Sequence, residues 1–398
     1  MRRILLHIAD ESGCSLHRLI LPHAYINKEE FEVTFGLPAD KVGDVEEIGK
    51  YDVFVFHRLL PSGFIDKIKA NCPNTKIICD IDDSWELTTS HILYNQYREH
   101  SIADEIKKHI RLADYVTTTT PLLAAKIKPF NPNVYVFPNA LIPESEFKPN
   151  PIPSDKIRFG IIGGCTHITD LQLLDGLIKQ LPPDVLDKIQ FVLGGFDKGF
   201  ITVPQENGET LRLPMEWKDN VWVHMEKILT NNYQTISPQH KEFLQQYNPS
   251  VEFISNEPYK RLWAKDVWNY ATLYDEIDVL LVPLLDNEFN RNKSELKMVE
   301  ASIKQKPCIV SDVMPYKLCA IPAIKKGGQI NPDGNCLLVN NAKGSRGWAK
   351  AIIRLVKDKE LKDMITTNLQ KLTEEGAKYN LKKVTEDRTN FYKQILNL

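Results

Sequence analysis

The 398-residue sequence predicts an α/β fold with two Rossmann-like domains, each built on a parallel, doubly wound sheet. Three observations predict it. Short apolar runs alternate with helical patterns over residues 1–137, which is typical of a parallel sheet. Residues 138–156 hold five prolines and little periodicity, as expected of a linker. A second alternation of strands and helices begins at Ile157.

The elements of the first half are short runs of Ile, Leu, Val and Phe between polar segments. The expected strands are Ile4–Ile8, Phe31–Phe35, Val53–Phe56, Lys76–Ile81, Tyr115–Thr117 and Val134–Phe137. Helical patterns lie between them, at Gly63–Ala70, Ile102–Leu112 and Leu122–Ile127.

The second half repeats the alternation around an irregular insertion at residues 197–250, which carries Trp217, Trp222 and Tyr233. The expected strands are Ile157–Ile162, Phe191–Leu193, Val251–Ile254, Val279–Pro283 and Cys308–Ser311. The expected helices are Leu171–Leu181, Tyr259–Tyr270, Ser345–Val356 and Glu360–Leu398, the last broken at Gly376.

Composition excludes several classes of protein. A net charge of −2 gives no global electrostatic case for binding nucleic acid or an anionic membrane surface. The seven cysteines are scattered and odd in number, so they predict free thiols in a reducing compartment rather than a disulfide framework. No apolar stretch approaches the length of a membrane span, and a cytoplasmic location is therefore expected.

The segment 275–316 holds the most informative chemistry. Val279–Pro283 predicts a strand buried on both faces, and Cys308–Ser311 predicts the next one. Between them, Ser294 is a candidate N-cap for a helix that runs to about Ile303. The unit is therefore strand, polar loop, helix and strand.

Charged residues follow this predicted helix at a regular interval. Lys293, Lys297 and Glu300 lie at i, i+4 and i+7, so they can share one face. Two ammonium groups beside free helix N–H groups suit a diphosphate, and a carboxylate one turn further on could accept hydrogen bonds from ribose hydroxyls. The same pattern also occurs on ordinary exposed helices, so spacing alone leaves both interpretations open.

The segment resembles the donor-binding region of GT-B glycosyltransferases, specifically the retaining enzymes of the large family-four type (group 1 glycosyl transferases). Those enzymes carry a Glu-x7-Glu signature followed by a strand that begins at a proline. Glu300 matches the second glutamate, Pro307–Ser311 matches the strand, and Asn292 stands where the first glutamate should be. A closer pattern, FN-x-x-KS-x-x-K-x-x-E, is matched by Phe289, Asn290, Lys293, Ser294, Lys297 and Glu300.

This resemblance implies a GT-B fold, with two Rossmann-like domains whose parallel sheets face each other across a cleft. Residues 1–150 would form the acceptor-side domain and residues 151–375 the domain that binds the nucleotide-sugar donor. Residues 376–398 would form a helix that packs back on the first domain. The implied activity is retaining transfer of a sugar from a nucleoside-diphosphate sugar to a hydroxyl acceptor, in polysaccharide or glycoconjugate synthesis. No cofactor or metal is expected.

A glycine pair follows the strand at Ile157–Ile162. Gly163 and Gly164 would let the backbone approach a phosphate, and the run resembles a GG-x-x-H-x-x-D segment of related transferases, matched further by His167 and Asp170. A tight turn with a capping aspartate explains the same residues, so this assignment stays open.

Other candidates lie where the strands of the first domain end. Asp80, Asp82 and Asp83 follow one strand, and His57 with Arg58 ends its neighbour. The carboxylates suit sugar or acceptor positioning, a turn, or less readily a divalent metal. Arg58 could offset them or reach a donor phosphate, and His57 could bind a sugar hydroxyl.

These observations combine into one hypothesis for the site. We expect Lys293, Arg58 and Asp82 to be catalytic. On the acceptor side we expect Gly13, His57 and Asp83. The expected donor-binding residues are Gly163, Gly164, His167, Asn292, Ser294, Lys297 and Glu300.

Three other functions remain open. The same chemistry could act on a modified DNA base, as in phage-type enzymes, although the sequence has no dense Lys/Arg run beside the aromatic residues of the insertion. A nucleotide-sugar epimerase would need an acid/base pair that the sequence does not offer. A non-catalytic sugar-nucleotide binding protein is kept open by Asn292 in place of a glutamate. Carbohydrate or lipid-linked acceptors are therefore favoured over DNA.

Overall fold

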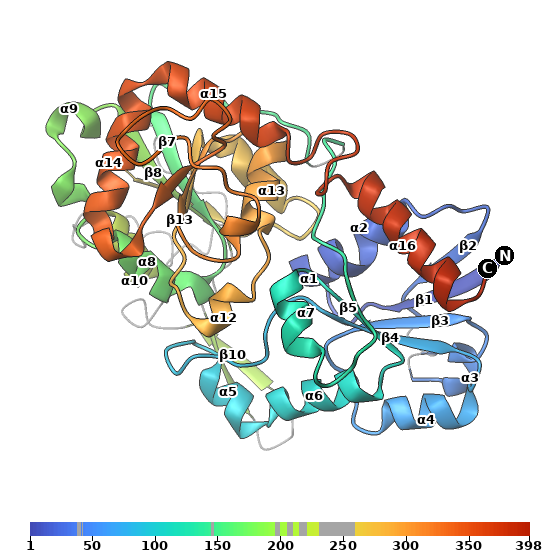
Figure 1. The fold of residues 1–398 in the computed structure, drawn as a ribbon. Coiled ribbons are helices and arrows are strands. Elements are labelled where there is room, and N and C mark those ends of the chain that lie inside the picture. Colours follow the sequence, from blue (N-terminus) through green and yellow to red (C-terminus); the bar gives the residue numbers. More distant parts are fainter. Residues whose placement is uncertain are drawn as a thin grey trace. The chain divides into compact units, whose positions relative to one another are not determined.

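The computed structural model describes residues 1–37, 41, 43–144, 147–195, 200–204, 210–214, 221–230 and 259–398. Contacts divide the chain into two compact units. Unit 1 comprises residues 1–142, 287–299 and 371–398, and unit 2 comprises residues 143–286 and 300–370. Figure 1 follows the chain through both units.

Unit 1 is built on a six-stranded parallel sheet in the order β2-β1-β3-β4-β5-β6. Its strands are β1 (Arg2–His7), β2 (Phe31–Phe35), β3 (Val53–His57), β4 (Lys76–Ile81), β5 (Tyr115–Thr118) and β6 (Val134–Val136). All neighbouring pairs in this sheet are parallel, with Ile4 opposite Val53 and Val53 opposite Lys76. The sequence predicted all six strands, because strands of a parallel sheet are buried on both faces and read as continuous apolar runs.

Helices cover both faces of this sheet. They are α1 (Gly13–Ser15), α2 (Leu21–Ala24), α3 (Val45–Ile48), α4 (Phe64–Asn71), α5 (Tyr94–Glu99), α6 (Ile102–Leu112), α7 (Pro121–Ile127), α12 (Glu288–Arg291) and α16 (Leu381–Ile395), with a π-helical turn at Leu16–Ile20. Local signals set the start of α7, since the Thr120 side chain accepts a hydrogen bond from the Leu123 amide and Pro121 occupies the first turn.

Two apolar cores flank the sheet. On one side, residues of β3 and β4 pack with α4 and α6 around Trp85. On the other, Leu381, Val384 and Phe391 of α16 pack against Ile4 and Leu6 of β1. Figure 1 shows α16 beside α2 on one face, with α4 and α6 on the opposite face. The C-terminal helix is thus part of the core of unit 1.

Unit 2 has a second six-stranded parallel sheet, in the order β11-β8-β7-β12-β13-β14. Its strands are β7 (Ile157–Ile162), β8 (Ile189–Gly195), β11 (Tyr259–Trp263), β12 (Val279–Val282), β13 (Cys308–Ser311) and β14 (Leu337–Val339). A separate antiparallel pair joins β9 (Phe200–Pro204) to β10 (Thr210–Pro214). Two parallel sheets with helices confirm the predicted α/β class.

In the part of unit 2 that the structure describes, the α-helices are α8 (Ile168–Leu171), α9 (Pro183–Leu186), α10 (Val221–Thr230), α14 (Gly344–Lys357) and α15 (Lys359–Gln370). Helix α13 (Leu296–Ile303) begins in unit 1 and ends in unit 2. One core gathers the buried faces of α10, α14 and the sheet, including Trp222, Trp348 and Phe159. Gly376, with φ of 78°, lies between α15 and α16, where the sequence predicted a break.

Two predicted helices of unit 2 were wrong. Tyr259–Tyr270 begins as strand β11 and continues into a 3-10 turn at Tyr270–Glu276, because its Tyr- and Trp-rich start pairs with β8 at the sheet edge. Leu171–Leu181 breaks into short turns at Gly176, whose φ of 74° is left-handed.

Other predictions about unit 2 lie outside the described residues. They are the strand Val251–Ile254 and most of the insertion 197–250, including Trp217 and Tyr233. Two predictions from composition can be compared with the structure. All seven cysteines are free thiols, as predicted. In the part of the chain that is described, no helix has the length and apolar character needed to cross a bilayer.

Candidate active site

Several predicted site residues converge at one edge of the unit 1 sheet. Gly13 starts α1, which follows β1; His57 is the last residue of β3; Asp82 and Asp83 follow β4. These strands are parallel neighbours, so their carboxyl ends meet at the same edge, where open α/β sheets bind ligands. The topology therefore explains why residues distant in sequence come together.

Asp82 is the centre of this group. One of its oxygens, Oδ1, lies 2.8 Å from His57 Nε2, 2.7 Å from Arg58 Nε and 2.5 Å from Arg58 Nη2. The residue is 8% exposed. Burial raises the pKa of its carboxyl group, but the charge of Arg58 and then that of His57 outweigh burial and hold this pKa well below its usual range. Asp82 is therefore an ionised, tightly paired carboxylate.

Arg58 reaches Asp82 from an unusual backbone conformation. Its φ is 57°, a left-handed value that non-glycine residues seldom adopt, and its amide donates to the Asp80 carbonyl at 3.0 Å. Such conformations persist where surrounding contacts hold them, and they cluster at functional sites. The turn directs the guanidinium toward both aspartates, since Arg58 Nη2 also lies 3.5 Å from Asp83 Oδ2.

Lys293 joins this group from a segment far along the chain. Its Nζ lies 3.4 Å from Asp83 Oδ2 and 4.6 Å from the centre of the Phe289 ring. The predicted polar loop around it contains the short helix α12, and α13 begins only at Leu296. Lys293 therefore precedes the helix, and the prediction that it shares a helix face with Lys297 and Glu300 was wrong.

Ser294, the predicted N-cap, makes a different contact. Its Oγ accepts a hydrogen bond from Asn139 Nδ2 at 2.9 Å, and Asn139 Oδ1 accepts from Arg18 Nη1 at 3.0 Å. Arg18 in turn pairs with both oxygens of Asp80, each at 2.9 Å. The segment that carries Lys293 is thus linked to a buried ion pair beneath the sheet edge.

Sequence reasoning missed this buried support. Arg18 is 1% exposed and Asp80 is fully buried, whereas the sequence around Arg18 fits an exposed helix position equally well. The available signal was Asp80 itself, because a carboxylate at the end of a buried strand needs a cationic partner.

Two further predicted residues of unit 1 differ in their surroundings. Asn292 is 5% exposed and donates from Nδ2 to the Glu288 carbonyl at 2.8 Å, which closes the end of α12. Gly13 is exposed, and a Cβ built on it would have no atom within 4 Å, so packing does not require glycine there.

The predicted donor residues of unit 2 lie at the carboxyl edge of its sheet. Gly163 and Gly164 follow β7, and His167 Nδ1 lies 2.8 Å from Asp170 Oδ2. Asp170 is buried, and its other oxygen accepts a hydrogen bond from the Leu285 amide at 2.8 Å. Asp170 thereby ties the turn after β7 to the turn after β12.

Sequence reasoning missed the tightest glycine of this edge. Gly195 ends β8 with φ of 133°, and a Cβ built on it would lie 1.9 Å from the Gly163 carbonyl oxygen. A second glycine pair, Gly194-Gly195 at the end of a predicted strand, was the available signal.

Glu300, the expected ribose ligand, is buried at 2% exposure. Its Oε1 accepts a hydrogen bond from the Tyr270 hydroxyl at 2.6 Å, and its Oε2 accepts one from the Tyr274 hydroxyl. A ribose hydroxyl would therefore have to replace a tyrosine hydroxyl at this carboxylate. Lys297, one turn earlier on α13, is half-buried.

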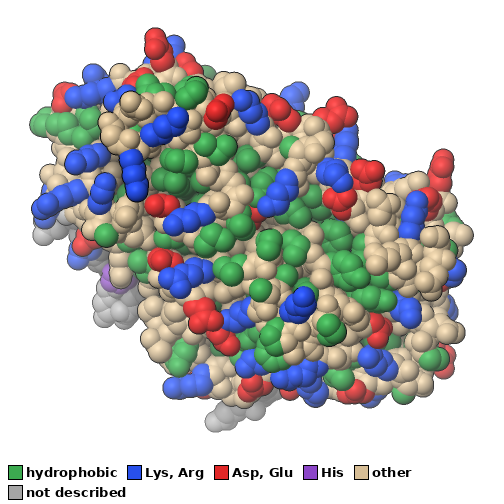
Figure 2. Space-filling view, in the orientation of Figure 1, with side chains coloured by type: hydrophobic (Ala, Val, Ile, Leu, Met, Phe, Trp, Pro, Cys, Tyr) green, Lys and Arg blue, Asp and Glu red, His purple; other side chains and the backbone are tan. Residues whose placement is uncertain are grey.

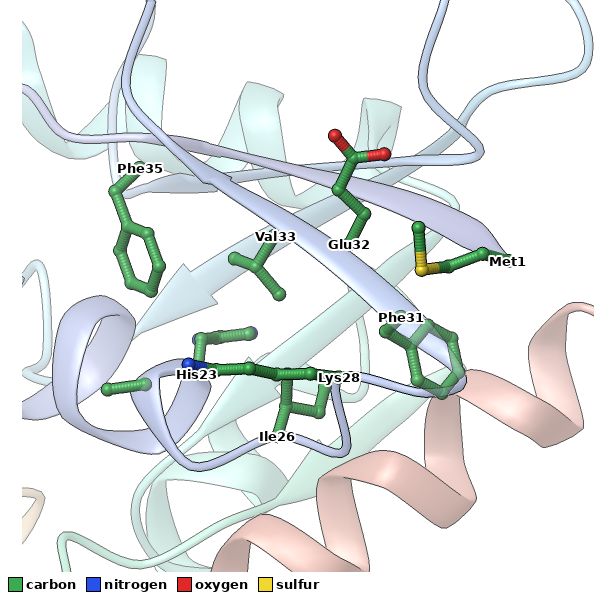
Figure 3. A pocket seen from close by; sticks show the side chains of 9 residues that line it. Met1, His23, Ile26, Lys28, Phe31, Glu32, Val33 and Phe35 are labelled. Atoms are coloured by element: carbon green, nitrogen blue, oxygen red, sulfur yellow. The ribbon is translucent and has the colours of Figure 1, made fainter.

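A cavity of about 450 Å³ lies elsewhere in unit 1, between β2 and the region of α2. In Figure 3, Phe31 and Val33 of β2 point toward Ile26 and His23, whereas the Glu32 carboxylate points to the other side of the strand. None of the predicted site residues lines this cavity. Its lining is mainly apolar, and we do not assign the activity to it.

Charges of both signs share the surface. On the face drawn in Figure 2, Lys and Arg side chains lie among Asp and Glu side chains in both units. This mixture agrees with the net charge of −2 and gives that face little of the single-sign character that nucleic-acid binding requires.

Comparisons with known proteins bear on the fold. No protein-family model matches the chain, and no curated protein matches it. Solved structures do. HepE of Anabaena, in complex with UDP and glucose, matches with a TM-score of 0.58 and 11% identity over 99% of this chain and 100% of its own. The UDP-forming α,α-trehalose-phosphate synthase of Burkholderia vietnamiensis matches with a TM-score of 0.56 and 10% identity over 100% and 99%.

TarM of S. aureus matches less completely, with a TM-score of 0.51 and 12% identity over 87% of this chain and 58% of its own. Identities this low show the fold alone. The architecture is that of the GT-B glycosyltransferases, as the sequence resemblance predicted.

Proposed function

We propose that this chain is a glycosyltransferase that moves a sugar from a nucleoside-diphosphate sugar to a hydroxyl group, with retention of anomeric configuration. The observation that carries the proposal is the convergence of Arg58 and Lys293 on Asp82 and Asp83 at the carboxyl edge of the unit 1 sheet. The GT-B fold, shared with a structure that contains UDP and glucose, supports it.

In this proposal the cations serve the leaving group. The reaction breaks the bond between the anomeric carbon and the diphosphate, so negative charge grows on the departing phosphate oxygens. Arg58 offers a planar fork of donors and Lys293 a mobile ammonium group, and both stabilise charge that develops in the transition state. Loss of one such donor typically costs about 100- to 1000-fold in rate.

The attacking hydroxyl approaches the same face of the sugar that the diphosphate leaves. Its oxygen forms the new bond to the anomeric carbon, and its proton passes to the departing phosphate. Asp82, ionised and already paired with His57, positions this acceptor rather than attacking the sugar itself. Gly13, His57 and Asp83 are assigned to the acceptor side.

The remaining predicted residues are assigned to the donor. Gly163, Gly164 and His167 would approach its phosphates, and Asn292, Ser294 and Lys297 would contact its sugar or diphosphate. Glu300 would hold the ribose after exchange of a tyrosine hydroxyl for a ribose hydroxyl. Carbohydrate or lipid-linked hydroxyls are the proposed acceptors, in glycan or glycoconjugate synthesis.

The proposed reaction uses no divalent metal. Mg²⁺ prefers near-octahedral coordination by oxygen, whereas the carboxylates here already face Arg58, His57 and Lys293. The two side-chain cations take the role that a metal ion fills on the diphosphate of metal-dependent transferases.

The decisive experiment screens a panel of nucleotide sugars for thermal stabilisation of the protein and then uses mass spectrometry to detect transfer to hydroxyl acceptors. Lys293→Ala should abolish the donor-induced shift in melting temperature and reduce transfer at least 100-fold, in line with the loss of one preorganised cation.

Lys107→Ala is the matched control, because Lys107 makes an i,i+3 pair with Asp104 on the surface of unit 1. This variant should behave as the wild type. Equal donor-induced shifts in Lys293→Ala and wild type would contradict the assignment. Donor binding with neither transfer nor hydrolysis would instead identify a binding protein.

A further inference from the structure

A group of three different donor side chains includes two of the proposed site residues, His57 and Asp82, and adds Cys14. Cys14 Sγ, an imidazole nitrogen of His57 and a carboxylate oxygen of Asp82 all lie within 4.8 Å of one another. They come from α1, from the end of β3 and from the turn after β4, so the sheet itself holds them at one edge. Sequence reasoning did not single out Cys14.

We infer that Cys14, His57 and Asp82 form a binding site for a thiophilic divalent ion of the Zn²⁺ type, and that its occupancy inhibits the enzyme. Thiolate, imidazole and carboxylate are the ligands that Zn²⁺ prefers, and three protein ligands leave a fourth position for water or another molecule. Binding of the ion stands on this geometry alone; inhibition rests on the proposed function.

The distances fit a tetrahedral ion after small side-chain movements. Zn²⁺ bonds of about 2.0–2.3 Å place neighbouring ligand atoms about 3.3–3.8 Å apart. The three ligand atoms already lie within 4.8 Å of one another. Rotation of side chains can bring the three atoms to these spacings without moving the strands.

The existing contacts of Asp82 indicate which carboxylate oxygen would bind the ion. Arg58 and His57 both contact Oδ1 of Asp82, so the second oxygen of the carboxylate is the one expected to face the ion. Binding breaks the S–H bond of Cys14, forms a sulfur–zinc bond and releases the thiol proton to solvent. His57 Nε2 binds the ion through its lone pair, so the proton that it donates to Asp82 moves to solvent or to Nδ1 of the same ring. No redox state changes. The new thiolate offsets one charge of the added dication.

Selectivity follows from the same donor set. A hard ion such as Mg²⁺ prefers oxygen ligands and gains little from sulfur, whereas Zn²⁺ and Co²⁺ gain from both thiolate and imidazole. Since binding displaces a thiol proton, affinity should rise about tenfold for each unit of pH over the range in which the thiol is protonated.

Inhibition follows because the ion takes groups that the reaction needs. His57 would give up its hydrogen bond to Asp82, and Asp82 would give one oxygen to the ion rather than to the acceptor. Transfer should therefore fall when Zn²⁺ binds and recover when a chelator removes it.

The test uses Co²⁺ as a spectroscopic substitute, with the full chain. Wild type should bind one Co²⁺ and show a sulfur-to-cobalt charge-transfer band with the intense visible bands of tetrahedral cobalt. Zn²⁺ should displace it. Cys14→Ser should lose the charge-transfer band and bind at least about 100-fold more weakly, because a direct ligand is gone. Cys319→Ser is the control, since Cys319 is a half-exposed cysteine of unit 2 that forms no disulfide, and it should bind as the wild type does.

The activity arm is independent of the binding arm. Cys14→Ser should keep transferase activity and become insensitive to Zn²⁺. Cobalt spectra without a thiolate band, or equal Co²⁺ affinity in wild type and Cys14→Ser, would overturn the site. Binding as expected in a protein without transferase activity would contradict the proposed function and leave the metal site standing. Equal Zn²⁺ inhibition of wild type and Cys14→Ser would overturn the inhibitory role.

Discussion

Replacing Arg388 by methionine should leave the protein as stable as the wild type or make it more stable, although Arg388 is a buried cation of α16. Three charges lie together in unit 1, with Asp80 fully buried and Arg18 and Arg388 each 1% exposed. Asp80 pairs with both donors of Arg18 at 2.9 Å, whereas Arg388 Nη2 lies 3.8 Å away. The buried group therefore carries one uncompensated positive charge.

The magnitude follows from the pKa of Arg388. Burial, then the nearby charge of Arg18, lower this pKa from 12.5 to about 10. At 1.36 kcal/mol for each pKa unit, keeping Arg388 charged in the folded state lowers the free energy of unfolding by about 3 kcal/mol at neutral pH. Methionine removes that cost. It also removes the contact of the guanidinium with the Phe137 ring, 4.8 Å away, and the hydrogen bond with Tyr392, worth about 2 kcal/mol together.

Asp80→Asn should have the opposite effect. It leaves two buried guanidinium groups without a carboxylate, and breaking a buried pair in this way costs about 3–5 kcal/mol. Urea denaturation at neutral pH, monitored by circular dichroism, measures the free energy of unfolding of both variants and of the wild type. The reasoning is refuted if Arg388→Met destabilises the protein as much as Asp80→Asn does.

Three further predictions concern single side chains. Burial lowers the pKa of His23 to about 3, so neutral His23 contributes fully to the free energy of unfolding above pH 6.5, and this contribution is lost as the pH falls toward 3. Between pH 8 and pH 5 the wild type should therefore lose about 2 kcal/mol of unfolding free energy that His23→Gln does not lose. Urea denaturation at both pH values measures the difference. Tyr274→Phe removes a hydroxyl from buried Glu300, so if Glu300 binds the ribose this variant should bind a nucleoside diphosphate more tightly in calorimetry, and unchanged or weaker binding would contradict that role of Glu300. Gly195→Ala should cost at least about 2 kcal/mol in thermal unfolding, because its Cβ would lie 1.9 Å from the Gly163 carbonyl oxygen, whereas Gly13→Ala, with open space around it, should cost nothing measurable.

Most of the sheet structure could be predicted from the sequence because buried parallel strands leave a strong local signal. Phe31–Phe35, Lys76–Ile81 and Ile157–Ile162 have the predicted bounds, and the last two are almost entirely buried. The edge strand β11 was the exception. Its sequence YKRLW has no continuous apolar run, and pairing with β8, a non-local contact, decides its conformation.

The site could be predicted only where topology alone brings residues together. His57, Arg58, Asp82 and Asp83 follow adjacent parallel strands, so their meeting follows from strand order. Lys293 is different. Its approach to Asp83 depends on the turn between α12 and α13, just before the helix that the sequence predicted up to Ile303, and no local pattern in the segment specifies that turn.

Buried polar partners were the least predictable part. The hydrogen bonds from Arg18 to Asn139 and from Asn139 to Ser294 span 121 and 155 residues, and each member is a common surface residue type. Such a network can be expected only because a buried carboxylate needs a positively charged partner, and the sequence does not show which residue provides that charge.

The geometry of the charge cluster also indicates how an anion would enter it. Two cations, Arg58 and Lys293, face two carboxylates, so the cluster is balanced before any diphosphate arrives. Arg58 is held by contacts of 2.5 and 2.7 Å to Asp82, whereas Lys293 lies 3.4 Å from Asp83. The shorter contacts of Arg58 are the stronger ones, so an incoming diphosphate should first replace Asp83 as the partner of the Lys293 ammonium group. Arg58 would then keep its place on Asp82 and present its remaining donors. On this argument Asp82 fixes the position of one cation, and Asp83 holds the other only until an anion replaces it.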